Sequence, residues 1–219
     1  MKLNIAIDGP SAAGKSTISK LLASELQYAH LDTGAMYRCV AYASLQEGID
    51  EQDEASLANL IDHMNISFDS DGNIYINHKN VSKQIRTNEM SMRASTVSTH
   101  PLVREKLVDL QRRIAKDKGY ILDGRDIGTV VLPDAEVKIY MVASVEARAK
   151  RRYKEYVEKH MEADYDEIYQ DIQKRDDQDM NRKTSPLKKA DDAQEIDTSD
   201  MSIEEVVSAI RNLIQTALT

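Results

Sequence analysis

A glycine-bounded loop near the N-terminus has the residue types that point most directly to chemistry. Residues 9–16 read Gly-Pro-Ser-Ala-Ala-Gly-Lys-Ser, between an apolar run at 3–8 and a helical pattern that begins at Lys15. The backbone N–H groups of such a loop can surround a phosphate chain, and Lys15 can reach the terminal phosphate oxygens. The Ser16 hydroxyl can ligate Mg²⁺. Strand, loop and helix in this order predict a phosphate-binding P-loop rather than a chance Gly/Ser turn.

A second polar segment, Asp32-Thr33-Gly34-Ala35-Met36-Tyr37-Arg38, follows the next short strand, predicted at 28–31. In open α/β sheets, ligands bind beyond the carboxyl ends of the strands, where this segment is expected to lie. Thr33 begins the next predicted helix and Arg38 lies inside it. The segment could hold an anionic acceptor beside the P-loop, although a capped helix with a surface arginine fits these residues equally well.

A third segment, Asp123-Gly124-Arg125-Asp126-Ile127-Gly128-Thr129, ends a hydrophobic strand predicted at 120–123. Asp123 stands where a Walker-B carboxylate would support Mg²⁺, directly or through water. Arg125 can fork onto phosphate, and Asp126 can accept from an exocyclic amine or pair with an arginine. A charged pair directly after a buried strand favours a functional site over a plain turn.

Two later stretches carry arginines at helical spacing, so that the members of each set share one side of a helix. A solvated face with salt bridges is the usual explanation of such a pattern. Phosphoryl transfer, however, needs several positive charges around one phosphoryl group, and an acidic chain must place them locally. The sets are Arg148, Arg151 and Arg152, and Arg175, Asp179 and Arg182.

The elements that must position these residues alternate between strands and helices, which predicts a parallel sheet. Strand patterns at 66–68 and 73–77, around an Asp71-Gly72 turn, interrupt the alternation and predict a small antiparallel insert. A helix is expected at 84–98. These elements resemble one core domain with two excursions, near 60–100 and 148–165.

Other signals mark where later helices begin. Pro101 begins a helix that ends near Gly119, and Ser144 can cap the next one. A polar loop is expected at 184–192. Ser202-Ile203-Glu204-Glu205 predicts a capping box for the last helix.

Composition narrows the class of protein. The 219 residues carry a formal net charge of −8 and a pI of about 5.2, which disfavours nucleic-acid or anionic-membrane partners. The one cysteine, Cys39, lies in an apolar stretch and is expected to pack in the core. We find no membrane-span pattern and no signal peptide, and we therefore expect a cytoplasmic protein.

Taken together, the three segments and 175–182 resemble the bacterial cytidylate kinase (CMP kinase) family, a nucleoside monophosphate (NMP) kinase type of P-loop protein. The resemblance covers the whole chain, including the insert. It implies a three-layer α/β P-loop kinase core with a parallel sheet, an enlarged NMP-binding insert and a short helical lid. Within a single domain at 1–219, it implies a core at 1–32, 101–147 and 166–219, an NMP-binding region at 33–100 with the insert at 65–100, and a lid at 148–165.

The resemblance also implies a role for individual residues. Thr33 stands where the family also has serine, and either hydroxyl can make the ribose contact. Arg148, Arg151 and Arg152 fall in the segment that resembles the mobile lid over ATP, and Lys15, Arg125, Arg152 and Arg182 would be catalytic. The P-loop positions that bind ATP would be Gly9, Pro10, Ser11, Ala12, Ala13, Gly14, Lys15, Ser16 and Thr17, with Arg148 and Arg151. The CMP contacts would be Ser95, Arg104 and Asp126 for cytosine, Thr33 and Asp179 for ribose, and Arg38, Arg125 and Arg182 for phosphate, with Arg175 nearby. Ser16 and Asp123 would hold Mg²⁺.

The implied reaction transfers a phosphoryl group from MgATP to CMP or dCMP, giving ADP and CDP or dCDP. The attacking phosphate oxygen is already anionic near neutral pH, so no general base is needed. Other small P-loop kinases, acting on UMP/CMP, AMP or a non-nucleotide such as shikimate, are alternatives, as is a nucleotide-operated switch module. We expect a monomer that binds nucleotides and neither nucleic acid nor a membrane.

Overall fold

A five-stranded parallel sheet forms the centre of the molecule. The computed structural model describes residues 2–69 and 72–218. Sheet order is β2-β6-β1-β7-β8, and every pairing is parallel. The strands are β1 (Asn4–Asp8), β2 (Ala29–Asp32), β6 (Tyr120–Gly124), β7 (Val137–Val142) and β8 (Gln194–Asp197). The predicted parallel sheet is therefore confirmed.

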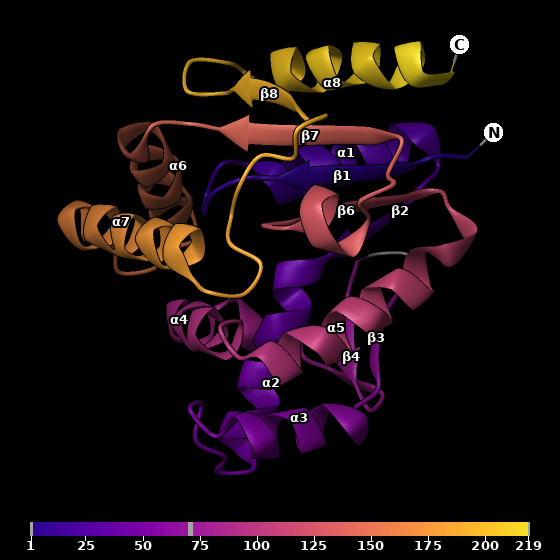
Figure 1. The fold of residues 1–219 in the computed structure, drawn as a ribbon. Helices are drawn as coiled ribbons and strands as arrows, with labels where there is room; N and C mark the ends of the chain where they lie inside the picture. The colour runs from indigo at the N-terminus through magenta and orange to yellow at the C-terminus, as the bar shows by residue number, and fades with distance from the viewer. Residues whose placement is uncertain (1, 70–71, 219) are drawn as a thin grey trace.

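Helices cover both faces of this sheet, as Figure 1 shows. Side chains alternate along β1: Ile5 and Ile7 pack against α1 (Lys15–Leu26) and α8 (Ile203–Leu218), whereas Ala6 faces the opposite side. That opposite side is covered by α2 (Thr33–Gln46) and α5 (Pro101–Ile114). The two buried layers fix the sheet between the helices, so the carboxyl ends of β1, β2 and β6 lie at one edge.

Residues 33–100, the region expected to bind the NMP, extend from α2 away from the sheet (Figure 1). This region contains α3 (Glu54–Asp62), the antiparallel strands β3 (Ile66–Phe68), β4 (Ile74–Ile76) and β5 (Lys79–Asn80), the short helix η1 (Gln84–Arg86) and α4 (Asn88–Val97). The predicted helix at 84–98 is thus interrupted, because Thr87 is extended and caps α4. Of the predicted Asp71-Gly72 turn, Asp71 lies outside the described residues.

Two further helices, α6 (Val145–Glu158) and α7 (Tyr165–Asn181), pack together at one end of the sheet. Ala149, Ile168 and Ile172 are buried between them. Gln178 on α7 donates a hydrogen bond to the carbonyl of Ser95 on α4, 3.1 Å away. The excursion at 60–100 therefore contacts α7 at the end of the sheet.

The predicted helix signals are confirmed at their caps. Ser144 accepts from the backbone N–H of Ala147. Ser202 accepts from the Glu205 N–H, while the Glu205 carboxylate accepts from the Ser202 N–H. The 3₁₀ turn η2 (Ala115–Asp117) and the π-helical turn η3 (Ile127–Val131) follow α5 and β6. Across residues 2–69 and 72–218, every helix is too short or too polar to cross a bilayer.

Candidate active site

One cavity of about 400 Å³ lies at the carboxyl edge of the sheet, between the P-loop, α2, α4, α6 and α7. Ten of its lining residues are Arg or Lys and five are Asp or Glu, in a chain whose formal net charge is −8. This excess of positive charge at one place suits a ligand with several negative charges. The cavity contains Ser11 to Thr17 of the predicted ATP site, both predicted metal ligands and the whole predicted CMP set.

The P-loop is held by close backbone packing. Gly9 has φ +152°, and a Cβ atom there would lie 2.1 Å from the carbonyl oxygen of Met141, so only glycine fits. Gly14, with φ +90°, directly precedes α1. Gly9 and Pro10 do not line the cavity themselves, but they shape the loop that does.

Lys15 is buried in this loop, where its ammonium group donates to the carbonyl of Pro10 at 2.7 Å. Burial, reinforced by the positive charge of Arg125, lowers the pKa of Lys15 to about 7. Asp123, Asp8 and Asp179 offset this lowering only in part, so a phosphate chain lying in the loop would add the negative charge that favours the protonated form.

The predicted metal ligands are already in contact. Ser16 Oγ donates to Asp123 Oδ2 at 2.7 Å, and His30 Nε2 lies 2.5 Å from Asp123 Oδ1. One hydroxyl and one carboxylate suit Mg²⁺, which takes oxygen ligands and usually completes its shell with water and substrate phosphates. His30 was not predicted, because a single histidine in a short strand has no spacing that links it to Asp123.

Four arginines around the centre of the cavity are partly paired. Arg38 contacts Asp32 at 2.8 Å and Arg125 contacts Asp179 at 2.7 Å. Burial and the charges of Arg125 and Arg152 lower the pKa of Arg175 to about 9. Neighbouring positive charges thus outnumber their carboxylates here, as a site for a phosphate group requires.

A second polar cluster lies deeper, against α2 and α5. Arg104 forms a buried ion pair with Asp126, and its guanidinium lies 5.4 Å from the centre of the Tyr37 ring. Ser95 Oγ and the Tyr37 hydroxyl are buried and have no hydrogen-bond partner within 2–69 and 72–218. Such groups are costly unless a ligand or water completes them. This cluster can therefore recognise a small polar, ring-sized group.

Arg182 and Asp179 link the two clusters. Arg182 lies 3.8 Å from Asp126 and 3.7 Å from Asp179. Burial alone would raise the pKa of Asp179, but Arg125 and Arg182 lower it overall. Thr33 Oγ1 donates to the carbonyl of Asp123 at 2.8 Å, which places its hydroxyl beside the same end of β6.

The three arginines expected on one side of a lid helix do not lie together. Arg148 is buried, donates to the carbonyls of Ala143 and Ser11, and pairs with Asp176 at 2.6 Å. Arg151 donates instead to Thr198 in the segment after β8. Of the three, Arg152 lines the cavity. The prediction that they share one side is therefore wrong, because Arg148 and Arg151 bind partners outside the helix that turn their side chains away from the cavity.

Several cavity residues were missed by sequence reasoning. Tyr37 lies inside the segment 32–38, and its aromatic side chain one residue before Arg38 is a signal that could have identified it. The others come from separated helices or turns and have no shared pattern; they are Lys20, Arg86, Ser91, Ser98, Glu155 and Lys159.

Comparison with known proteins agrees with the geometry. The Cytidylate kinase family model matches residues 5–216. A cytidylate kinase of Bacillus cereus (strain B4264) is 48% identical over 216 residues, covering 97% of this chain and 96% of that protein. A cytidylate kinase of Bacillus thuringiensis (strain Al Hakam) is 47% identical over the same shares.

Solved structures bear on the fold. A shikimate kinase from Bacteroides thetaiotaomicron superposes with a TM-score of 0.50 at 12% identity, covering 98% of this chain and 99% of that one. An uncharacterized protein from Eubacterium ventriosum gives a TM-score of 0.54, also at 12% identity, over 99% of both chains. The P-loop kinase core is therefore confirmed. Because the family model spans almost the whole sequence and curated relatives match over nearly their full lengths, the chain belongs to the cytidylate kinase family.

Proposed function

We propose that this nucleoside monophosphate kinase transfers the γ-phosphoryl group of ATP to CMP or dCMP and releases ADP with CDP or dCDP. The observation that carries the proposal is one cavity that contains a P-loop and, beside it, the Arg104–Asp126 pair with an arginine cluster between. The P-loop accounts for a donor nucleotide, and the pair accounts for an acceptor with a polar ring.

On the donor side, residues 11–17 would surround the phosphates of ATP with backbone N–H groups. Lys15 would contact the terminal phosphate oxygens, and Arg152 would approach them from α6. Ser16 and Asp123 would hold Mg²⁺, which when bound offsets the negative charge of the phosphate chain. The support for this arrangement is the contact between Ser16 and Asp123 and the buried position of Lys15.

On the acceptor side, each part of CMP has a complementary group. The carboxylate of Asp126 would accept from the N4 amine of cytosine, while Arg104 and Ser95 would donate to its N3 and O2 acceptors. Thr33 and Asp179 would bind the ribose. The phosphate would lie among the guanidinium groups of Arg38, Arg125, Arg175 and Arg182.

The chemistry then requires positioning more than proton transfer. A phosphate oxygen of CMP attacks the γ-phosphorus in line, the bond to the ADP oxygen breaks, and no general base is used. Lys15 and the arginines offset the charge on the transferring group. Regions 33–100 and 148–165 would close over the core at 1–32, 101–147 and 166–219, excluding water and limiting hydrolysis of ATP.

We further propose that the enzyme acts in the cytoplasm as a monomer, with nucleotides as its partners and neither nucleic acid nor a membrane. The acidic composition supports the proposal that the enzyme binds neither nucleic acid nor a membrane. Size-exclusion chromatography with light scattering tests the monomer: a mass near 24.7 kDa is expected, and a concentration-independent dimer would contradict it.

A coupled ADP-release assay tests the reaction, with CMP, dCMP, UMP, AMP, shikimate and no acceptor compared side by side. CMP and dCMP should give the highest kcat/KM, and the reaction without acceptor should be slowest. Preference for another acceptor would contradict the assignment. ATP turnover that needs a partner protein and no acceptor would instead support a switch module.

A further inference from the structure

Asp8 is a buried carboxylate with no role in the reaction described so far. It is the last residue of β1 and directly precedes Gly9, yet its side chain is 4% exposed. Its Oδ1 accepts from the backbone N–H of Ile127 at 2.8 Å, and its Oδ2 accepts from the N–H of Gly128 at 2.7 Å. Both carboxylate oxygens therefore hold the turn that follows Asp126.

The turn also packs against Lys138. A Cβ atom at Gly128 would be in tight contact with the Lys138 side chain, at 3.2 Å, and in ordinary contact with Asp8 Oδ2, at 3.5 Å. The carbonyl of Asp126 closes the turn by accepting from the N–H groups of Val130 and Val131. The backbone on the C-terminal side of Asp126 is thus fixed at three successive residues, two of them through Asp8.

The side chains that precede this turn face the cavity. Asp126 pairs with Arg104, and Arg125 pairs with Asp179. Small shifts of the Ile127 and Gly128 peptides would therefore move the groups assigned to cytosine and to the acceptor phosphate. Burial raises the pKa of Asp8 to about 6, although the two N–H donors lower it, so the carboxylate stays mostly ionised at neutral pH.

We propose that Asp8 is a positioning residue for the acceptor side of the reaction, holding the 127–128 peptides so that Arg125 and Asp126 meet the acceptor nucleotide. The proposal rests on the proposed function for the identity of that acceptor. Asp8 is adjacent in sequence to the loop assigned to ATP, yet in this proposal it governs selection of the other substrate, the acceptor nucleotide.

The first test replaces Asp8 with asparagine. An amide can accept through its oxygen, but its NH₂ group would face the second backbone N–H, which loses its acceptor. Loss of one buried acceptor should weaken CMP binding roughly tenfold and lower the CMP-over-UMP ratio of kcat/KM, with ATP affinity changed less than about twofold. Separate titrations with each nucleotide measure the affinities, and steady-state kinetics give the ratio.

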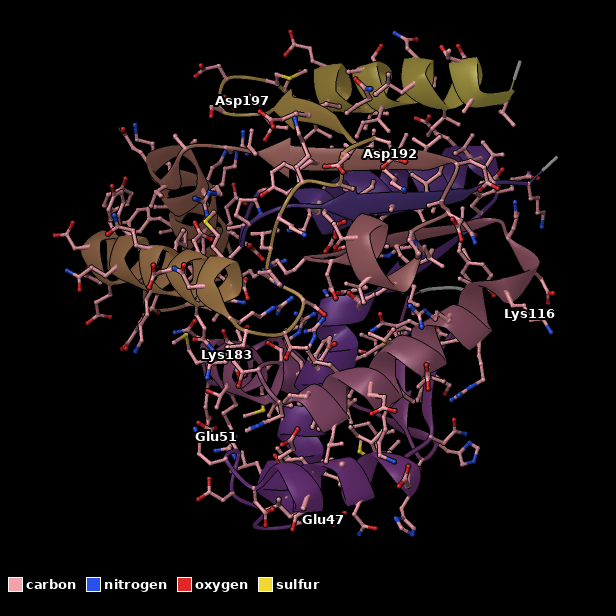
Figure 2. The ribbon with its side chains drawn as sticks, viewed as in Figure 1. Glu47, Glu51, Lys116, Lys183, Asp192 and Asp197 are labelled. Atoms are coloured by element: carbon pink, nitrogen blue, oxygen red, sulfur yellow. The ribbon has the colours of Figure 1, made fainter. Side chains whose placement is uncertain are left out.

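A second variant changes the turn itself instead of the carboxylate. Gly128→Ala leaves the carboxylate in place and should give the same asymmetry, smaller in size, which keeps the test valid if Asp8→Asn does not fold. Asp197→Asn is the control for losing a carboxylate at a strand end: Asp197 also ends a strand and accepts from a backbone N–H, that of Ser199, but it is exposed, does not line the cavity and lies beside β8 at the top of Figure 2. This variant should change neither the affinity for ATP nor the affinity for CMP.

Equal losses for ATP and CMP in Asp8→Asn or Gly128→Ala would overturn the proposal, because Asp8 would then act through the P-loop. Unchanged CMP affinity and selectivity in a folded variant would also overturn it. The wild-type acceptor panel separates this result from a failure of the proposed function. If wild type prefers another acceptor, that function is wrong, and the same asymmetry is measured with the preferred acceptor against ATP.

Discussion

The two sides of the cavity are built by different means. The proposed donor side consists of one continuous loop, 11–17, with a single buried lysine, and in our proposal its backbone N–H groups bind the phosphates. The proposed acceptor side consists of side chains from α2, α4, α5, α7 and the end of β6, several of them joined by ion pairs. Backbone recognition suits phosphates, which most nucleotides share, whereas side-chain networks can distinguish one base from another.

This difference predicts that a single change on the donor side affects every acceptor equally. Lys15→Ala should lower the turnover rate by about 10²–10³-fold, as expected for loss of one charge-stabilising donor. The CMP-over-UMP ratio should stay the same. Lys20→Ala is the matched control, because Lys20 lines the same cavity from α1. A Lys15 variant that keeps half the wild-type rate would contradict the assignment.

On the acceptor side, Arg38→Met and Arg182→Met should each weaken CMP binding by roughly 10- to 100-fold, through loss of charge-assisted hydrogen bonds. ATP affinity should be almost unchanged. Separate binding titrations check this, with Arg211→Met as control, since Arg211 pairs with Glu25 at the surface. Parallel losses for both nucleotides would show that the two sides are not independent.

Base selection should depend on Asp126 in particular. Uracil presents a carbonyl where cytosine presents an amine, so Asp126→Ala should lower the CMP-over-UMP ratio of kcat/KM at least roughly tenfold. Asp126→Asn should lower the ratio further, because an amide can donate to uracil. A constant ratio with both values reduced would move base recognition to Ser95 and Arg104.

The two sides should also differ in proton linkage, the smallest of these effects. Lys15, with a folded-state pKa of about 7, is largely neutral at pH 8.5 and should regain a proton when phosphate arrives. ATP binding at pH 8.5 should therefore take up about one proton, and much less at pH 6. Arg175, whose pKa is about 9, is already mostly charged at pH 8.5, so CMP binding should take up less than one proton. Calorimetry in buffers of different ionisation enthalpy measures both.

The lowered pKa of Lys15 also affects how the free energy of unfolding depends on pH. The lowered pKa of Lys15 means that the unfolded chain binds this proton more tightly than the folded one. Its contribution to the free energy of unfolding is therefore smallest below pH 7 and increases as pH rises from about 7 toward the usual lysine value.

The donor side was predictable from sequence because its residues are contiguous and their spacing has a direct geometric meaning. On the acceptor side, Arg38, Arg125 and Asp126 were singled out from their positions after strands, but Ser95 and Arg104 were assigned only by resemblance, because no spacing brings them together with Asp126. Strand β8 was not predicted: it is an edge strand with the sequence Gln-Glu-Ile-Asp, and only its pairing with β7 makes it a strand. Arg148 and Arg151 showed the limit of helical periodicity, which does not reveal what lies beside a helix.

Arg148 also has a mechanical consequence. It ties α6 to the P-loop carbonyl of Ser11 and to Asp176 on α7, while the adjacent Ala149 is fully buried. The first turns of α6 are thus held against the P-loop and α7, whereas Arg152, Glu155 and Lys159, further along the chain, line the cavity. We expect bending to begin beyond Ala149, so that a small rotation there sweeps the tip at 159–164 through the longest arc.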